Sequence, residues 1–114
     1  MNKYWTVKTK HTSNFPDPLF VNKNEAIRIG REDSEYPGWF FCKVKASDKE
    51  GWVPDQLIER DGDGHTGTVN ADYSARELNV EAGDKVESNR ELNGWAWCVT
   101  EEGTAGWLPL DKLE

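Results

Sequence analysis

The sequence predicts an all-β protein built from two small, similar domains in tandem. Residues 38–59 (GWFFCKVKASDKEGWVPDQLIE) and 94–114 (GWAWCVTEEGTAGWLPLDKLE) repeat one pattern of glycine-tryptophan pairs, a cysteine and a closing proline segment. Short aromatic or β-branched runs alternate with turn residues. No segment of a dozen residues keeps a 3.6-residue period, so we expect essentially no α-helix. A repeat of this length suits a pair of small β domains rather than a solenoid.

Seven strands are expected in chain order. They cover residues 26–29, 39–44, 51–53, 78–80, 84–87, 95–100 and 106–108. Turn-forming residues such as Asn93-Gly94 separate them. A single 3₁₀ turn is expected after each proline segment, at 55–57 and 110–112.

The segment RDGDGH (60–65) is interpreted as a polar hinge, because two glycines among aspartates favour flexibility. This interpretation places one domain at residues 1–60 and the other at 67–114. Residues 61–66 form the linker between them.

Alternation along the two central strands predicts which side chains face the core. The side that holds Cys42 and Cys98 is the expected core, because small residues at matched positions suit a tight interior. Trp39 and Trp95 then lie on the opposite side, where a large ring needs a ligand, a partner or a loop to cover it. Both thiols are expected to stay reduced, each inside its own domain.

The net charge of −7 is unevenly distributed. Residues 1–60 hold 10 basic and 9 acidic side chains, whereas residues 61–114 hold 4 and 12. An acidic second half argues against nucleic-acid binding, which needs a basic face, and favours a basic partner. The alternative is that the acids only keep a small protein soluble. No apolar run has the length of a signal peptide or a membrane span, so we expect a cytoplasmic protein without a membrane partner.

The second half resembles a Src-homology-3 (SH3) domain in four segments that follow in order. These are VNADYSA (69–75), ELNVEAGDKVE (77–87), NGW (93–95) and GTAGWLPLDKLE (103–114). They are similar, in turn, to the family's ALYDY stretch, its "ELSF" segment, its first ligand-binding tryptophan, and its distal hairpin with the closing proline motif. The resemblance covers almost the whole second half.

The first half resembles the same family more loosely, through residues 18–29, 37–39 and 51–59. Its counterpart of the ALYDY stretch, VKTKH (7–11), has no aromatic residue, and its RT-like loop (13–18) is longer. The chain is therefore similar to a tandem pair of bacterial "variant SH3" domains.

The resemblance implies two five-stranded antiparallel barrels, each with an aromatic groove that can hold a polyproline II segment. It implies groove residues Tyr73, Trp95 and Pro109 in the second domain, and Trp39 and Pro54 in the first. Other groove tyrosines are replaced. Their places are taken by Ala71 and Lys112 in the second domain, and by Thr9, His11 and Leu57 in the first.

Acidic residues accompany the expected grooves. Glu77, Glu87 and Glu91 belong to the second domain, and Glu32, Asp33 and Glu35 precede Trp39 in the first. Carboxylates beside an indole can hold a cationic side chain through charge and cation–π contacts.

No cofactor, metal or catalytic residue is expected. Counted from Asp61, the linker has Thr66 at the sixth place and Asp72 at the twelfth, where a calcium loop needs glycine and glutamate. No serine stands in the company of a histidine and an acid.

These observations predict a non-catalytic binding module that recognises a peptide or loop of a protein partner, proline-containing or basic. A monomer or a weak dimer is expected. The alternative is a structural or assembly unit whose aromatic faces pack between domains or subunits, with no free groove. A third interpretation is glycan or cell-wall binding, which the absence of a signal peptide does not favour.

Overall fold

The computed structural model describes residues 2–13 and 17–114, and they form an all-β protein. In these two ranges every helix is a single 3₁₀ turn, and none is long and apolar enough to cross a membrane. The elements follow in the order β1 (Lys3–Thr6), β2 (Phe20–Val21), β3 (Ala26–Glu32), β4 (Trp39–Val44), β5 (Glu50–Pro54), η1 (Asp55–Leu57), β6 (Ile58–Arg60), β7 (Thr66–Val69), β8 (Tyr73–Ser74), β9 (Lys85–Leu92), β10 (Trp95–Thr100), β11 (Ala105–Pro109) and η2 (Leu110–Lys112).

Six of the seven expected strands are confirmed, as β3, β4, β5, β9, β10 and β11, and both expected 3₁₀ turns are confirmed as η1 and η2. Residues 78–80 do not form a strand and contribute a single bridge between Val80 and His11. Five further strands, β1, β2, β6, β7 and β8, were not expected from the sequence. They have only two to four residues each, which is too short for an alternating pattern to stand out.

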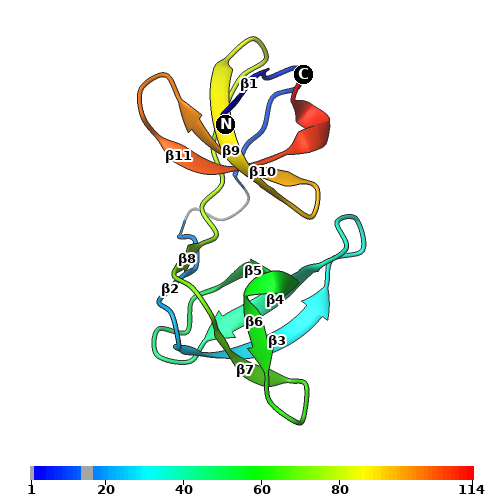
Figure 1. Ribbon diagram of the computed structural model, residues 1–114, viewed down its shortest axis with the longest axis vertical. Helices are drawn as coiled ribbons and strands as arrows, with labels where there is room; N and C mark the ends of the chain where they lie inside the picture. The colour runs from blue at the N-terminus through cyan, green and yellow to red at the C-terminus, as the bar shows by residue number, and fades with distance from the viewer. Residues whose placement is uncertain (1, 14–16) are drawn as a thin grey trace. The chain divides into compact units, whose positions relative to one another are not determined.

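The chain divides into two compact units, which we call unit 1 and unit 2 (Figure 1). Unit 1 comprises Met1–Pro16 and Arg76–Glu114, and unit 2 comprises Asp17–Ala75. Neither unit matches an expected domain. The middle of the longer RT-like loop, residues 14–16, lies outside the described residues.

Unit 1 contains an antiparallel sheet with the strand order β1-β9-β10-β11. A β-bulge at Trp97/Cys98 shifts the register between β9 and β10. Its core is a cluster of buried residues from β9, β10 and β11, from the residue that follows β1, from the segment before β9 and from the C-terminal residues. The cluster consists of Val7, Leu78, Val80, Val86, Ala96, Cys98, Leu108 and Leu113.

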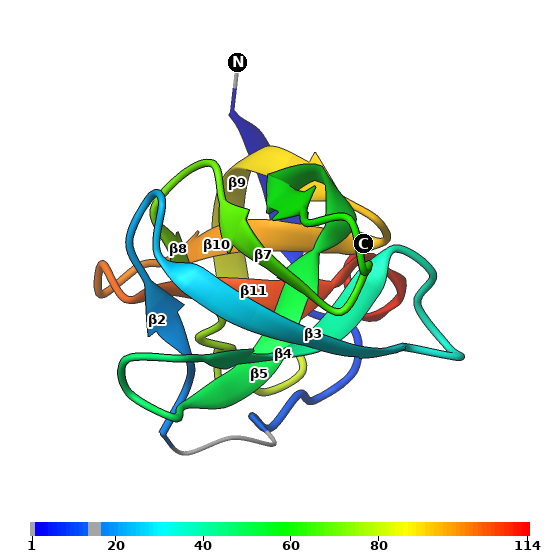
Figure 2. The same ribbon diagram turned by 90° about the horizontal axis from the view of Figure 1, so that it is seen from below.

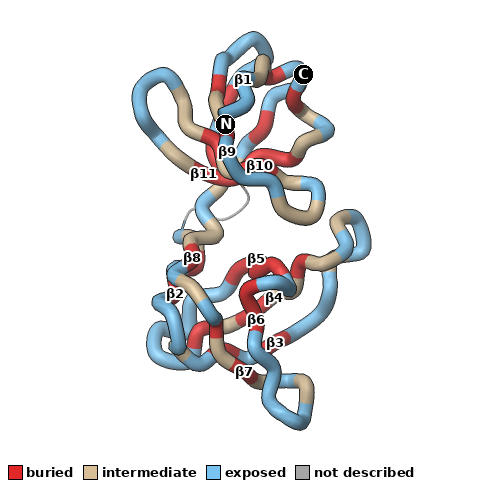
Figure 3. The backbone as a smooth tube through the Cα atoms, viewed as in Figure 1, coloured by how far each residue is buried: buried red, intermediate tan, exposed pale blue. Residues whose placement is uncertain are grey.

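Unit 2 contains a five-stranded antiparallel sheet with the order β5-β4-β3-β7-β6, and β2 pairs with β8 in a separate two-stranded ribbon. Figure 2 shows β3, β4 and β5 side by side in this unit. Along β3, Ile27 and Ile29 are buried and their neighbours are exposed, which is the alternation of a half-covered strand (Figure 3).

The two repeats exchange their first strands. β1 precedes the first repeat in sequence, but it pairs with β9 and, beyond Thr6, with the C-terminal Leu113 and Glu114. β7 precedes the second repeat, but it pairs with β3 and β6 of the first. The expected division at 60 and 67 is therefore replaced by one at 16/17 and 75/76. Sequence repeats identify equivalent strands, but they do not show which copy each strand joins.

The segment expected to be a linker, 61–66, is the tight turn of the β6–β7 hairpin. The backbone N–H of Asp61 donates to Thr66 O at 2.9 Å, and Arg60 pairs with Gly67. The carboxylate of Asp63 accepts hydrogen bonds from the backbone N–H groups of His65 and Thr66. These bonds, first of all the one from His65, hold the pKa of Asp63 below its usual value. The two glycines predict a flexible hinge, but the aspartates between which they stand accept hydrogen bonds that order the turn.

The prediction that the cysteine side of the central strands faces the core is confirmed, since Cys42, Val44, Ala96 and Cys98 are all buried. The prediction that Trp39 lies on a surface is wrong, because its side chain is 4% exposed. Residues 33–38 fold back over the start of β4: Asp33 N–H donates to Trp39 O at 2.8 Å, and Gly38 N–H donates to Glu32 Oε2 at 2.9 Å. Strand alternation alone does not anticipate this loop.

Candidate functional site

The exchange of first strands redistributes the expected groove residues. Trp95 and Pro109 belong to unit 1, together with the three acids Glu77, Glu87 and Glu91. Tyr73 belongs to unit 2, as do Trp39 and Pro54. The expected combination of Tyr73 with Trp95 and Pro109 is therefore not assembled within one unit. In unit 1 the place expected for Tyr73 is taken by His11.

Trp95 and Pro109 are cross-strand partners at the ends of β10 and β11. The indole of Trp95 is half-buried, and it meets the imidazole of His11 edge to face, with ring centroids 5.7 Å apart and an interplanar angle of 83°. His11 is held in place by its backbone, which exchanges hydrogen bonds of 3.0 and 2.9 Å with Val80. Rigid backbone pairing therefore positions one wall of this aromatic site.

The imidazole of His11 is the centre of a polar cluster. Its Nε2 lies 2.8 Å from Glu77 Oε1, and its Nδ1 lies 3.0 Å from Lys112 Nζ. An ammonium group can only donate, so Nδ1 is the acceptor, and Nε2–H then donates to the Glu77 carboxylate. The imidazole thus lies between the side chains of Lys112 and Glu77 and contacts both. We call His11, Glu77 and Lys112 the histidine cluster.

The sequence analysis singled out Glu77 as a groove acid but missed its pairing with His11. His11 and Lys112 both stand at positions where the resemblance implies a groove tyrosine. This shared feature was a signal in the sequence that could have pointed to the cluster. The expected domain bounds place His11 and Lys112 in different domains, so their contact was not predicted. The exchange of β1 places them in one unit.

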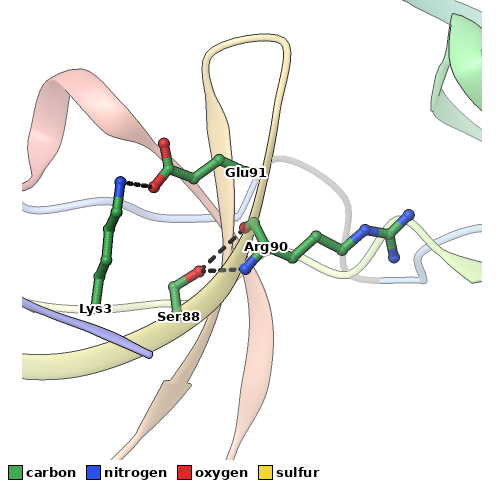
Figure 4. A network of polar contacts seen from close by, with 4 residues as sticks. All are labelled: Lys3, Ser88, Arg90 and Glu91. Atoms are coloured by element: carbon green, nitrogen blue, oxygen red, sulfur yellow. Dashed lines mark hydrogen bonds and ion pairs between the residues drawn. The ribbon is translucent and has the colours of Figure 1, made fainter. Parts of the chain in front are cut away.

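Glu87 and Glu91 have partners away from Trp95. Glu91 Oε2 forms an ion pair of 2.8 Å with Lys3 Nζ, next to the backbone atoms of Arg90 that contact the Ser88 hydroxyl (Figure 4). Glu87 accepts a hydrogen bond of 3.1 Å from the side chain of Asn2. Glu91 lies opposite Ala96, next to Trp95, but Glu87 lies opposite Val99. Glu77 contacts His11, which in turn contacts Trp95.

In unit 2 the expected groove residues are buried. Tyr73 donates its hydroxyl to Trp52 O at 2.8 Å, and Trp39 is the cross-strand partner of Pro54. The side chains of Tyr73, Trp39 and Pro54 all have low exposure. The carboxylate of Asp33 accepts a hydrogen bond from Glu35 N–H, so this acid orders its own loop, as Glu32 does.

Each unit also carries an aromatic pair with an arginine over it. In unit 2, Phe41 and Trp52 meet at a centroid distance of 5.1 Å, with the Arg31 guanidinium 4.9 Å from Phe41. In unit 1, Trp97 and Trp107 meet at 5.3 Å, with the Arg90 guanidinium 5.7 Å from Trp107. The pairs are cross-strand neighbours in both units. The contacts between the rings, and between ring and guanidinium, stabilise the two hairpins. The positions of the two arginines were not predicted from the sequence.

A separate open cavity of about 370 Å³ lies between β1, β9 and β10 of unit 1. Tyr4, Trp5 and Val99 provide aromatic and aliphatic lining, and Glu87 and Glu101 provide carboxylates. Tyr4 is 80% exposed. Nothing in the sequence pattern indicated this surface.

Both cysteines are free and buried, one in each unit. Burial raises the pKa of the Cys42 thiol to about 12 and that of the Cys98 thiol to about 11. Thiols of this kind are not nucleophiles near neutral pH. Within residues 2–13 and 17–114, no group of three or more histidine, cysteine, aspartate or glutamate side chains is placed to hold a metal ion.

Comparisons with known proteins add one partial similarity. No family model matches the chain, and no solved structure matches it. The chain is similar to maltoporin from three strains of Vibrio cholerae serotype O1, with 25% identity over 95 residues. The alignment covers 83% of this chain and 23% of each maltoporin, so the chain spans about a quarter of the length of these relatives. This identity does not establish a family.

Proposed function

We propose that each unit is an SH3-like five-stranded barrel, and that the chain is a non-catalytic binding module for a peptide or loop of a protein partner. Antiparallel strands with a 3₁₀ turn after each proline segment support the barrel assignment. Each barrel takes its first strand from the opposite repeat. The binding residues of unit 1 are then Trp95, Pro109 and His11, with Glu77 behind the imidazole.

The observation that carries this proposal is the edge-to-face contact between Trp95 and an imidazole held at both ring nitrogens. A site with a fixed geometry loses little conformational entropy when a ligand binds. A preformed polyproline II segment adds the same advantage on the ligand side. The net charge of −7 favours a partner segment with basic residues.

A titration of the ¹⁵N-labelled chain with proline-rich basic peptides tests this function. We expect the Trp95 indole N–H signal to shift selectively and to saturate. The Trp95→Ala variant should lose binding and keep the remaining indole signals in their folded positions. Tyr4→Ala is the matched control, because it removes an exposed ring of the same unit away from Trp95. Unchanged affinity in Trp95→Ala would contradict the proposal.

For unit 2 we propose the alternative role, that of a structural or assembly unit. Burial of Trp39, Tyr73 and Pro54 favours it, because these residues offer little accessible ring surface. Trp39→Ala should therefore lower the stability of unit 2 by about 3 kcal/mol, the usual cost of removing a buried aromatic ring. Peptide affinity should stay unchanged in this variant. Loss of affinity with unchanged stability would assign a binding role to unit 2 as well.

A further inference from the structure

β1 is an edge strand of the unit 1 sheet, and its outer edge is paired only in part. Thr6 exchanges two backbone hydrogen bonds of 2.8 Å with Glu114 on this edge. Two residues further on, Lys8 N–H donates to Lys112 O at 2.8 Å. Backbone groups of alternate residues point to the same side of a strand, so the N–H and C=O of Tyr4 also face this edge. Among residues 2–13 and 17–114, none pairs with the edge at Tyr4.

The open edge borders the cavity of about 370 Å³ that β1, β9 and β10 line. Trp5 packs against the core cluster and Cys98 belongs to it. Their neighbours Tyr4 and Val99 therefore point to the opposite, outer face of the sheet. Tyr4, Glu87 and Val99 are cross-strand neighbours on this face. An exposed ring, an aliphatic side chain and a carboxylate thus lie side by side.

The charged groups that line the cavity leave one negative charge uncompensated. They are the carboxylates of Glu87 and Glu101 and the ammonium group of Lys85, two negative charges against one positive. Lys85 Nζ donates to the hydroxyl of Thr6 at 2.7 Å, and Glu87 accepts a hydrogen bond of 3.1 Å from Asn2. The carboxylate of Glu101 has no hydrogen bond or ion pair with any residue that the structure describes.

A lysine or arginine side chain has the chemistry that complements this lining. Its aliphatic stem can cover the apolar surface of Val99 while its charged head remains among polar groups. The head can pair with Glu101 and lie near the ring of Tyr4, where charge and cation–π attraction act together. An acidic or purely apolar side chain would leave Glu101 without a counter-ion.

We propose that β1 and this cavity form a docking site for an extended segment of a partner protein, which continues the pairing of Leu113–Glu114 along β1 and places one lysine or arginine side chain in the cavity. The docked segment accepts a hydrogen bond from Tyr4 N–H and donates one to Tyr4 O, as in strand addition at a sheet edge. Proline has no N–H to donate, so a proline-rich segment does not fit here. This site and Trp95 lie at opposite ends of β10 and select different segments.

A titration of the ¹⁵N-labelled full chain with the capped peptide acetyl-Thr-Val-Arg-Val-Thr-amide tests the proposal. We expect the backbone amide signals of Tyr4, Val99 and Glu101 to shift and to saturate. The Tyr4 amide should exchange more slowly with solvent, because it gains a hydrogen bond. The Trp95 indole signal should stay in place, so the result does not depend on whether proline-rich peptides bind at Trp95.

Matched variants test the selection of a cation. Glu101→Gln should weaken binding about threefold to fivefold, because it removes the unpaired carboxylate. Glu102→Gln is the control, since Glu102 is the next residue of the same turn and does not line the cavity. A peptide with norleucine in place of arginine keeps the stem without the charge. It should bind the parent chain more weakly by the same factor, and Glu101→Gln should not weaken it further.

A peptide N-methylated at both valines tests the pairing with β1. It cannot donate to Tyr4 O through these residues and should bind about fivefold more weakly.

Three results would overturn the proposal. If the Tyr4 and Glu101 signals do not move at the highest soluble concentration of the arginine peptide, no extended segment of this kind docks on β1. If Glu101→Gln and Glu102→Gln have equal effects, or the norleucine peptide binds the parent chain as tightly, the cavity does not select a cation. If the N-methylated peptide binds equally well, the edge at Tyr4 does not pair with the ligand.

Discussion

His11 Nε2 lies 2.8 Å from Glu77 Oε1, and this pair joins the two sequence segments of unit 1 across 66 positions of the chain. The two side chains are only 6% and 9% exposed. A hydrogen bond to a carboxylate is strong in such surroundings, and an unmade one is costly. The pair therefore fastens the segment that follows β1 to the body of unit 1.

We expect Glu77→Gln to lower the free energy of unfolding of unit 1 by about 2 kcal/mol, because the amide keeps the shape but removes the charge that strengthens the bond. Chemical denaturation followed by the unit 1 indole signals measures this change. Glu81→Gln is the control, since Glu81 makes a loose, exposed ion pair of 3.9 Å with Lys10 and should change stability by less than about 0.5 kcal/mol. Equal effects of the two changes would show that burial of the His11–Glu77 pair contributes nothing.

Gly67→Ala should destabilise unit 2 by about 3 kcal/mol, because its new Cβ would meet the Glu59 carbonyl at 2.2 Å and the β6–β7 pairing must shift. Denaturation followed by the Trp39 and Trp52 signals reports on this unit. Gly62→Ala is the matched control in the adjoining turn, where nothing lies within 4 Å of a built Cβ. A neutral Gly67→Ala would show that the backbone at this point accommodates a Cβ atom without cost.

The decrease in the free energy of unfolding at alkaline pH should depend on the two buried thiols. Burial raises the pKa of Cys42 from 9.0 to about 12 and that of Cys98 to about 11, so the folded chain retains protons that the unfolded chain releases. Their contribution is intact below the unfolded pKa and declines as pH rises through the folded values. At a pH of about 10 we expect a loss of about 1 kcal/mol per thiol.

The Cys42→Ala/Cys98→Ala double variant checks this pH dependence. Its stability should be lower overall, but it should fall less steeply than that of the parent chain above a pH of about 9. Denaturant midpoints at several pH values give both slopes, and the lysines and tyrosines common to the two chains cancel in the comparison. Identical slopes would show that the thiols do not titrate differently in the folded chain.

Local patterns predicted most of the strands but not the way in which they are joined. Alternation located β4 and β10 and identified Cys42 and Cys98 as core residues, because side-chain direction in a strand follows from neighbouring positions. Which strand β1 and β7 each pair with was not predicted. β1 pairs with β9, and β7 pairs with β3 and β6, so each pairing joins strands that are far apart in the sequence, or in different repeats, and no local period encodes it.

The candidate site was also predicted only in part. Trp95 and Pro109 were identified from the repeat and are cross-strand partners. The histidine cluster was not, because Lys112 and His11 are 101 positions apart and meet only after β1 crosses to unit 1. Wrong domain bounds thus led directly to the expectation that Tyr73 completes the Trp95 site.

The exchanged strands make a last prediction about which fragments fold. Residues 17–75 contain every strand of unit 2, so this fragment should fold alone and give dispersed signals for Trp39 and Trp52. Residues 1–60, which hold the whole first repeat, lack β7 and with it Val69, which is fully buried and lies opposite Ile58 in the sheet. A domain of this size has little stability to spare, so loss of one central strand should leave the fragment unfolded. Proton–nitrogen spectra of the two fragments decide the matter: a dispersed spectrum for 1–60 and a collapsed one for 17–75 would mean that each repeat keeps its own first strand.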